Sequence, residues 1–232
     1  MGWPTTEAPA GKMTTQPRSA GLIPAAGMGE RLGLGPKAFI QAGGLTLLEH
    51  AVARLAPAVD RVVVALPAGG CDTKPAGLAE VPCIEGRANR RATVRALLEA
   101  VDEPWVVIHD AARPFTPTDV FTRVLNAAYT TNAASAALPV ADTLHHAGRD
   151  MPVDRHDLMA IQTPQAFNRE TLLQAHRNPA HQNVDVTDDA QLVRIDGGAV
   201  TLVQGSRRSH KITFPEDLPF VEALMRGWTP SP

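Results

Sequence analysis

The residues best suited to chemistry are a few cations and one acid that follow short apolar runs. Small residues from Pro24 to Gly29 come directly after the apolar stretch Ala20–Pro24, and Arg31 and Lys37 stand shortly beyond them. Glycine and alanine let backbone N–H groups approach phosphate oxygens closely, while arginine and lysine add charged donors. The pattern therefore predicts a phosphate-binding loop, and its plainer alternative is a tight turn with solvated cations.

This loop matches neither of the two common nucleotide fingerprints. No small residue follows three places after Gly29, which excludes a dinucleotide-binding G-x-G-x-x-G, and the absence of a Gly-Lys-Ser/Thr excludes a P-loop. Its place after an apolar run still suits a nucleotide, because ligands of open α/β sheets bind beyond the carboxyl ends of the strands.

One acid and a second basic segment complete the candidate chemistry. Asp110 follows the apolar run Trp105–His109, so we expect its carboxylate at the carboxyl edge of a sheet. Together with phosphate oxygens, one such carboxylate is enough to hold Mg²⁺. Arg113 is expected to pair with Asp110 and brace the loop. Lys211 ends the basic run Ser206–Lys211, whose plainer interpretation is a solvated loop.

Length and composition bound the class of protein. With 232 residues, 44% of them hydrophobic and 20% charged, the chain fits one globular domain. The formal net charge of −2 provides no global basic field, so no nucleic-acid partner is expected. No apolar run approaches the length of a membrane span, and no membrane association is expected.

The N-terminal segment and the cysteines bear on the compartment. Residues 1–18 are rich in Pro, Thr, Gly and Ala and lack the apolar core of a secretory signal. They are predicted to form a disordered tail, with Met13 as an alternative start. Cys71 and Cys83 are the only cysteines and form no C-x-x-C pair, so neither a disulfide nor a cysteine zinc site is predicted. A reducing compartment, the cytoplasm by default, fits this usage.

Alternating strand and helix patterns predict the fold class. Strands are expected at Ala20–Pro24, Arg61–Leu66, Trp105–His109 and Ala199–Val203. Helices are expected at Leu45–Leu55, Arg91–Val101, Val120–Tyr129 (opened by Thr116-Pro117), Arg169–His176, Asp188–Ile195 and after Pro215. The alternation predicts an α/β domain with a mostly parallel sheet flanked by helices. Between about 140 and 160 the sequence becomes polar, which predicts a protruding hairpin or arm.

Taken in order, several motifs resemble the 2-C-methyl-D-erythritol 4-phosphate cytidylyltransferases of isoprenoid biosynthesis. The resemblance runs from about Ala20 to Met225. Its motifs are the first loop, Pro36-Lys37, Arg90–Val94, His109–Pro114, Asp142-Thr143, Thr163–Phe167 and Lys211–Leu218. It implies a single Rossmann-like nucleotidyltransferase domain over residues 19–228, Mg²⁺ as cofactor, and a homodimer formed through a β-arm at about 140–160.

The resemblance also implies roles for individual residues. Arg31, Lys37 and Lys211 would hold the triphosphate and the transition state. The nucleotide would contact Pro24, Ala25, Ala26, Gly27, Gly29, Gly86, Arg90, Thr93, Asp110 and Ala111. The methylerythritol phosphate would contact Asp110, Thr143, Thr163, Lys211 and, from the neighbouring subunit, Arg155. Asp110 would also lie at the metal. Thr187 to Ala190 match a family stretch to which we assign a supporting role.

Two departures from the family pattern are visible. Arg87 follows Gly86 where the family has a second glycine, and Ala88 stands where an acidic residue reads the base. This change leaves the strength of base discrimination open. His145 replaces a lysine of the arm, which alters only the charge of the arm.

The implied reaction needs no general base, because its nucleophile is a phosphate oxygen that is already ionised at neutral pH. It needs in-line positioning and charge stabilisation by Mg²⁺ and cationic side chains. Four alternatives compete with this function: a sister enzyme that acts on ribitol 5-phosphate, a transferase that uses GTP or UTP, a catalytically silent nucleotide-binding scaffold, and a glycosyltransferase. The last is disfavoured because no Asp-x-Asp follows a predicted strand.

Overall fold

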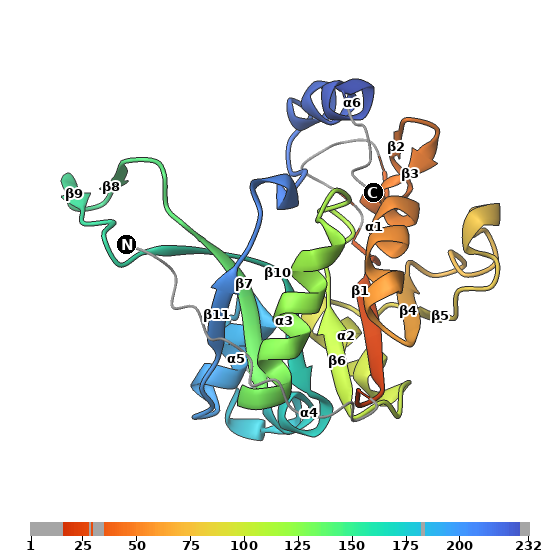
Figure 1. Cartoon of the computed structure of the whole chain (residues 1–232), viewed down its shortest axis with the longest axis horizontal. Helices are drawn as coiled ribbons and strands as arrows, with labels where there is room; N and C mark the ends of the chain where they lie inside the picture. The colour runs from red at the N-terminus through yellow and green to blue at the C-terminus, as the bar shows by residue number, and fades with distance from the viewer. Residues whose placement is uncertain (1–15, 28, 30–34, 182–183, 228–232) are drawn as a thin grey trace.

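The computed structural model describes residues 16–27, 29, 35–181 and 184–227, and a seven-stranded sheet lies at its centre (Figure 1). The strand order is β11-β7-β10-β6-β1-β4-β5. These strands are β1 (Ser19–Pro24), β4 (Arg61–Leu66), β5 (Cys83–Glu85), β6 (Trp105–Ile108), β7 (Ala133–Pro139), β10 (Met159–Asn168) and β11 (Thr201–Gln204). Among these described strands, only β10 runs antiparallel to its neighbours, β6 and β7. The predicted α/β fold with a mostly parallel sheet is confirmed.

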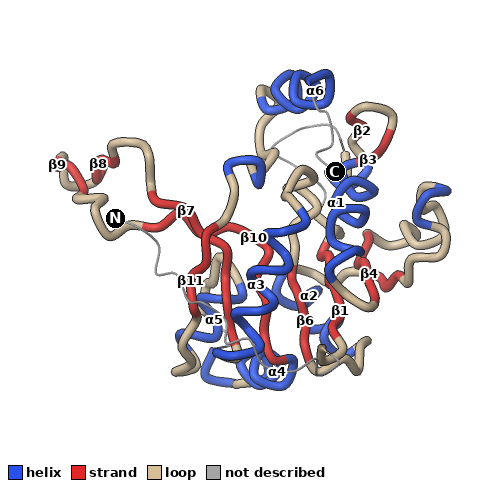
Figure 2. The backbone as a smooth tube through the Cα atoms, viewed as in Figure 1, coloured by secondary structure: helices blue, strands red, loops and turns tan. Residues whose placement is uncertain are grey.

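Helices cover both faces of this sheet (Figure 2). They are α1 (Leu47–Leu55), α2 (Arg90–Glu99), α3 (Thr118–Thr131), α4 (Arg169–Arg177) and α5 (Asp189–Ile195), whereas α6 (Asp217–Gly227) lies beyond the sheet, above it in Figure 1. Short 3₁₀ turns lie at Lys37–Phe39, Ala56–Ala58, Ala76–Leu78, Pro179–His181 and Arg207–Ser209, and β2 (Gln41–Ala42) pairs with β3 (Leu45–Thr46). Most buried apolar residues of α1 and those of α3 join one core cluster, while those of α2, α4 and α5 join a second; Leu47 of α1 and Val221 of α6 belong to a smaller third cluster.

Strand β4 shows why the central strands are apolar throughout. Val62, Val64 and Leu66 belong to the core cluster beneath α1 and α3, whereas Val63 and Ala65 belong to the opposite cluster. Successive side chains point to opposite faces of a strand, so a strand covered by helices on both sides has no polar face. This requirement produces the run of valines that marks the strand in the sequence.

The predicted helix starts lie within two residues of the observed ones, and Leu45 and Thr46, which were expected in a helix, form β3 instead. Asp188 caps α5 by accepting a hydrogen bond from the backbone N–H of Gln191 at 2.7 Å. For α3, Thr116 does not act as a cap. The N-cap is Pro117, without a side-chain cap bond, and the Thr116 hydroxyl donates instead to the carbonyl of Arg113 at 3.1 Å. That backbone oxygen lies in the loop after β6, a contact that sequence spacing does not show.

The sheet contains two long strands that the sequence patterns did not predict, β7 and β10. Strand β7 reads Ala-Ala-Ser-Ala-Ala-Leu-Pro, and alanine is depleted in strands. Strand β10 contains Gln162, Thr163, Pro164 and Gln165, which interrupt any simple alternation, and the pairing with β7 shifts register between Ile161 and Gln165. Both become strands because they pair with each other and lie under helix α3.

The polar stretch at 140–160 forms the predicted protruding arm. It carries the hairpin of β8 (Leu144–His146) and β9 (Met151–Val153), which extends away from the sheet in Figure 1. Strands β7 and β10 lead into the arm, and the backbone N–H of Val140 donates to the carbonyl of Leu158 at 3.2 Å.

A disulfide between Cys71 and Cys83 contradicts the prediction that the cysteines are unpaired. Their Cα atoms are 5.7 Å apart across a sequence separation of 12 residues. The connection from β4 to β5 folds back and places both residues at the edge of the sheet, which a spacing so unlike C-x-x-C does not reveal. The cysteines therefore give no argument for a reducing compartment. No cluster of metal-ligating residues is present among the described residues.

The predicted N-terminal tail lies largely outside the described residues. Residues 1–15 are not described, whereas Pro17 accepts a hydrogen bond from the Tyr129 hydroxyl at 3.2 Å and Arg18 pairs with Glu103 at 3.4 Å. Within the described ranges, no helix has both the length and the apolar character required to cross a bilayer.

Candidate active site

A cleft of about 490 Å³ opens at the carboxyl ends of β1, β5 and β6. It is lined by Pro24, Ala25, Ala26, Gly27, Gly29, Lys37, Ala38, Arg87, Ala88, Asn89, Arg90, Thr93, Asp110, Ala111, Ala112, Lys211 and Thr213. The loops that line it come from positions far apart in the sequence, and they meet because parallel strands present their carboxyl ends at one edge of a sheet.

The loop after β1, which was predicted to bind phosphate, forms one wall of the cleft. It begins with a hydrogen bond from the backbone N–H of Ala25 to the carbonyl of Ala65 at 2.8 Å. Gly29 has a φ of 68°, and a Cβ there would lie 2.5 Å from the carbonyl oxygen of Gly35. Only glycine at position 29 therefore allows the backbone there to lie this close to Gly35. Arg31 lies outside the described residues.

A second wall is the loop from Gly86 to Asn89, which connects β5 with α2. The Thr93 hydroxyl accepts a hydrogen bond from the backbone N–H of Arg87 at 2.9 Å and donates to the carbonyl of Asn89 at 2.9 Å. Its hydrogen bonds therefore hold the loop in shape. Asn89 caps α2 and lines the cleft, as does Thr213, and the sequence patterns predicted neither as a site residue. The Asn cap before an apolar helical stripe is the signal that could have found Asn89.

Gly86 begins this second loop without lining the cleft itself, and it sets how closely the two loops approach. A Cβ at position 86 would lie 2.1 Å from the Cβ of Ala26. Gly86→Ala should therefore push the two loops apart and raise KM for the expected nucleotide about tenfold, with a smaller effect on kcat. Steady-state kinetics would measure this. Gly148→Ala is the control, because a Cβ at this position in the arm turn would lie no closer than 3.7 Å to any neighbouring atom. An unchanged KM in Gly86→Ala would show that the two loops do not shape the nucleotide site.

Asp110 is the only carboxylate among the described residues that line the cleft, and three cations surround it. Its side chain lies 2.8 Å from Lys211 Nζ, 3.6 Å from Arg90 Nη2 and 4.0 Å from Arg113 Nε. Burial alone would raise the pKa of Asp110, but Arg90, Lys211 and Arg113 together hold it well below its usual range. The carboxylate is therefore ionised at neutral pH. The expected pairing of Arg113 with Asp110 is present at the outer limit of an ion pair.

Lys211 is held at the cleft by contacts of its own segment. The backbone N–H of Ile212 donates to the carbonyl of Ala112 at 2.9 Å, and Arg113 Nη1 donates to the carbonyl of Ser209 at 2.5 Å. These bonds join the segment before α6 to the loop after β6. As a result, a lysine that is about 100 residues away from Asp110 in sequence lies beside it in space.

His109 and Thr163 form a buried hydrogen-bond chain beneath Asp110. The backbone N–H of Asp110 donates to Thr163 Oγ1 at 3.1 Å, and that hydroxyl lies 3.2 Å from His109 Nδ1. His109 Nε2 lies 3.2 Å from the carbonyl of Arg113. All distances fit a neutral imidazole that donates from Nε2 and accepts at Nδ1. Thr163 thus supports Asp110 from behind and is not among the residues that line the cleft.

This neutral, buried histidine predicts an acid-sensitive fold. Burial lowers the pKa of His109 to about 4, although Asp110 opposes the shift. As the pH falls below 6.5, His109 becomes protonated in the unfolded chain but not in the folded chain. The free energy of unfolding is therefore highest above pH 6.5 and falls as the pH drops toward 4. Between about pH 7 and pH 5 the loss from this residue should be about 2 kcal/mol.

Urea unfolding at both pH values would measure this loss. His109→Gln should show a pH dependence smaller by that amount, even if its stability at neutral pH is lower. Equal pH dependence in the two proteins would contradict the assignment.

Besides Thr163, two more of the predicted substrate residues do not line this cleft. Thr143 and Arg155 are exposed residues of the arm and do not line the cleft of their own chain. Arg155 Nη1 donates to the carbonyl of Ala141, a contact that ties the two sides of the arm together.

Comparison with known proteins places this geometry in a family. The family model for 2-C-methyl-D-erythritol 4-phosphate cytidylyltransferase matches residues 20–227, nearly the whole chain. The chain belongs to this family. A 2-C-methyl-D-erythritol 4-phosphate cytidylyltransferase of Deinococcus radiodurans is 51% identical over 216 residues, with 91% of each chain covered.

Solved structures of the family agree with the fold. The crystal structure of the cytidylyltransferase from Thermus thermophilus has a TM-score of 0.80 at 43% identity, covering 90% of this chain and 99% of that one. A 4-diphosphocytidyl-2C-methyl-D-erythritol synthase structure from Anaerococcus prevotii has the same TM-score at 27% identity, covering 90% and 96%. Family members are nucleotidyltransferases, so a catalytically silent scaffold is not supported.

Proposed function

We propose that this chain transfers CMP from CTP to 2-C-methyl-D-erythritol 4-phosphate, giving 4-diphosphocytidyl-2-C-methyl-D-erythritol and pyrophosphate. The observation that carries this proposal is the family match over residues 20–227, which includes every residue that lines the cleft. The relatives are named as 2-C-methyl-D-erythritol 4-phosphate cytidylyltransferases, which favours methylerythritol phosphate over ribitol 5-phosphate as the acceptor.

The chemistry requires two polyanions to meet. An ionised phosphate oxygen of the acceptor attacks the α-phosphorus of CTP in line, the bond to the β-phosphate breaks, and pyrophosphate leaves. No proton has to be removed from the nucleophile, which agrees with a cleft where Asp110, the one carboxylate of its described lining, is already paired with cations. The protein must instead neutralise charge and hold both phosphates in line.

Cations at the cleft are assigned to that task. Lys37 and Lys211 line it, and we propose that they bind the triphosphate and stabilise the charge that develops on the transferred phosphoryl group, together with Arg31. Asp110 accepts the Lys211 ammonium at 2.8 Å and so fixes its position. The walls from Pro24 to Gly29 and from Gly86 to Thr93 are assigned to the nucleotide, with Ala111 beside Asp110.

Mg²⁺ is proposed as the cofactor. Its preferred ligands are hard oxygens, and it commonly binds through one carboxylate together with substrate phosphates. Asp110 offers one such carboxylate, which fits an ion that is bound mainly by the triphosphate. When bound, the ion would neutralise phosphate charge. Arg90 and Lys211 also contact this carboxylate, so the protein alone presents no closed cation site in its described part.

We propose that the arm forms a homodimer. Thr143 and Arg155 do not line the cleft of their own chain, so we propose that they reach the acceptor phosphate in the site of a second subunit. A guanidinium suits a phosphate because its planar fork pairs with two oxygens. We propose the cytoplasm as the compartment because the reaction consumes CTP, and no nucleic-acid partner because the net charge is −2.

Pyrophosphate release tests the reaction directly. The protein should release pyrophosphate with CTP, methylerythritol phosphate and Mg²⁺ together, and at least tenfold more slowly when UTP replaces CTP. EDTA should abolish turnover, and excess Mg²⁺ should restore it. Ribitol 5-phosphate in place of the acceptor is the matched control. Equal rates with the two acceptors, or full activity in EDTA, would overturn the assignment of acceptor or cofactor.

A further inference from the structure

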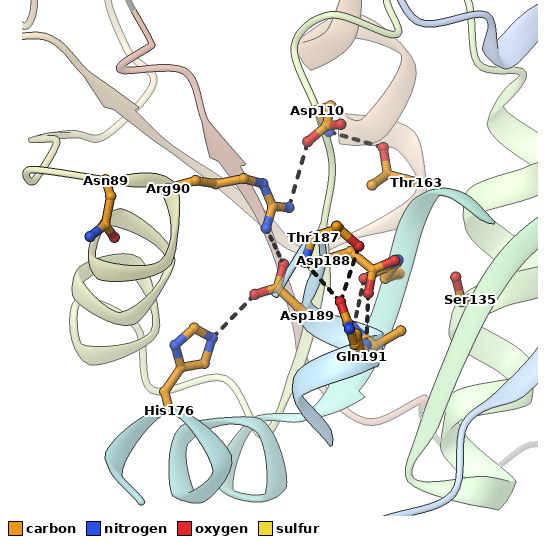
Figure 3. Close-up of polar contacts among 12 residues, drawn as sticks. Asn89, Arg90, Asp110, Ser135, Thr163, His176, Thr187, Asp188, Asp189 and Gln191 are labelled. Carbon is orange, nitrogen blue, oxygen red and sulfur yellow. Dashed lines mark hydrogen bonds and ion pairs between the residues drawn. The ribbon is translucent and has the colours of Figure 1, made fainter. Parts of the chain in front are cut away.

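The guanidinium of Arg90 is shared between two carboxylates, and only Asp110 of these two belongs to the cleft. Arg90 Nη2 lies 3.6 Å from Asp110, while Nη1 lies 2.8 Å from Asp189 (Figure 3). The shorter contact is thus to the residue behind the cleft, 99 positions away in sequence. Arg90 is also the first residue of α2, where the helix dipole disfavours a cation, so an anionic partner is favourable there.

Asp189 is buried, and each of its two carboxylate oxygens has a partner. Its side chain is 3% exposed, and its second oxygen lies 3.2 Å from Nε2 of His176, whose side chain is 1% exposed. Burial would raise the pKa of Asp189, but Arg90 and His176 lower it, so the group is ionised. A carboxylate is the side chain that accepts a hydrogen bond on each of two oxygens. An amide would turn an N–H toward one of these donors.

The position of Asp189 is itself fixed by the sheet. Asp189 begins helix α5, and the preceding cap residue, Asp188, accepts a hydrogen bond from Gln165 Nε2 at 3.1 Å. Gln165 Oε1 in turn accepts from the backbone N–H of Ala190 at 3.1 Å. Strand β10, which also carries Thr163 beneath Asp110, therefore anchors the start of α5. Figure 3 shows the resulting chain from His176 through Asp189 and Arg90 to Asp110.

We propose that Asp189, oriented by His176, is a positioning residue for cytidylyl transfer that holds Arg90 at the wall of the cleft. Without Asp189, the remaining ion-pair partner of Arg90 among the described residues is Asp110. Arg90 would close onto Asp110, leave the nucleotide, and compete with Lys211 for the same carboxylate. This inference rests on the proposed function, because it assigns Arg90 to the bound nucleotide.

A double-mutant cycle tests whether Asp189 acts through Arg90. Asp189→Asn and Arg90→Met should each lower kcat/KM for CTP at least tenfold, and the double variant should be no worse than the weaker single variant. A merely structural contribution would multiply the two losses. Multiplied losses, or an Asp189→Asn variant within twofold of wild type, would overturn the proposal. If Asp189→Asn shows no cooperative unfolding transition, Asp189→Glu replaces it, since it keeps the charge but displaces the carboxylate.

The chain offers a matched control at the other end of the same helix. Asp196, which follows α5, accepts from His181 Nε2 at 2.8 Å and from Asn178 at 2.7 Å, and none of these residues lines the cleft. Asp196→Asn should keep kcat/KM within twofold of wild type. A loss as large as that of Asp189→Asn would mean that α5 acts only through its stability, which overturns the proposal.

Calorimetric titration with CTP separates this proposal from the proposed function. The same non-additive pattern is expected in the dissociation constant of CTP, which requires no turnover. If wild type binds CTP and shows that pattern but releases no pyrophosphate with methylerythritol phosphate, the proposed reaction fails and the positioning role stands. If wild type turns over but the CTP cycle is additive, the positioning role fails alone. A wild type that neither binds CTP nor turns over would overturn both.

Discussion

Lys211→Ala is expected to lower kcat about a hundredfold or more, because it removes a charged donor aimed at the transferred phosphoryl group. Folding should change little, since the Lys211 side chain is 44% exposed and exposed ion pairs contribute little to stability. Lys37→Ala should give a loss of similar size. Single-turnover kinetics with saturating CTP would separate this loss from weaker binding.

Lys74→Ala provides the matched control for both lysines. Lys74 Nζ donates to the carbonyls of Ala79 and Val81 at 3.1 and 2.6 Å, in the connection between β4 and β5, and does not line the cleft. Its removal should lower the melting temperature without changing kcat more than twofold. If Lys211→Ala instead keeps kcat within threefold of wild type, Lys211 serves only to pair with Asp110.

Arg155→Ala is expected to raise KM for methylerythritol phosphate at least tenfold while KM for CTP stays within twofold. The reason is that Arg155 lies on the arm, outside the cleft that is assigned to CTP. Arg149→Ala, which removes a second exposed arginine of the same arm, is the matched control and should change neither constant. Equal rises in both KM values for Arg155→Ala would show that Arg155 acts only through the structure of the arm.

Mixed dimers give the larger effect and test the dimer itself. Arg155→Ala and Lys37→Ala subunits should each be nearly inactive under subsaturating acceptor. After exchange, heterodimers carry one site that is intact in both its cleft and its arm, so about a quarter of wild-type activity should return. The exchange should be verified with differently tagged subunits. Verified exchange without recovered activity would mean that the arm serves its own subunit.

Local patterns were sufficient for most elements of the fold. Strand β4 was predicted with the bounds that the structure has, Arg61–Leu66, because burial on both faces leaves an unbroken apolar run. The helices were predicted within a few residues, since an amphipathic stripe and a cap are local features. The loop from Pro24 to Gly29 and Lys37, which were predicted from small residues and a lysine after a strand, line the cleft.

Pairing between distant segments was decided only by the tertiary structure. The alanine-rich β7 and the polar β10 have weak strand propensity, and each is a strand because the other lies beside it. The disulfide between Cys71 and Cys83 arises in the same way, from a chain reversal at the edge of the sheet.

The same distinction applies to the candidate site. The sequence by itself determined which residue types stand at the ends of the strands, and so pointed to Asp110, whereas Lys211 was indicated only by the family resemblance. Only the tertiary structure showed that Arg90 binds Asp189 and that Asp189 binds His176. The physical reason is that a strand or helix depends on neighbours within a few residues. The charge balance of a buried group depends on every residue that the fold brings within hydrogen-bond distance.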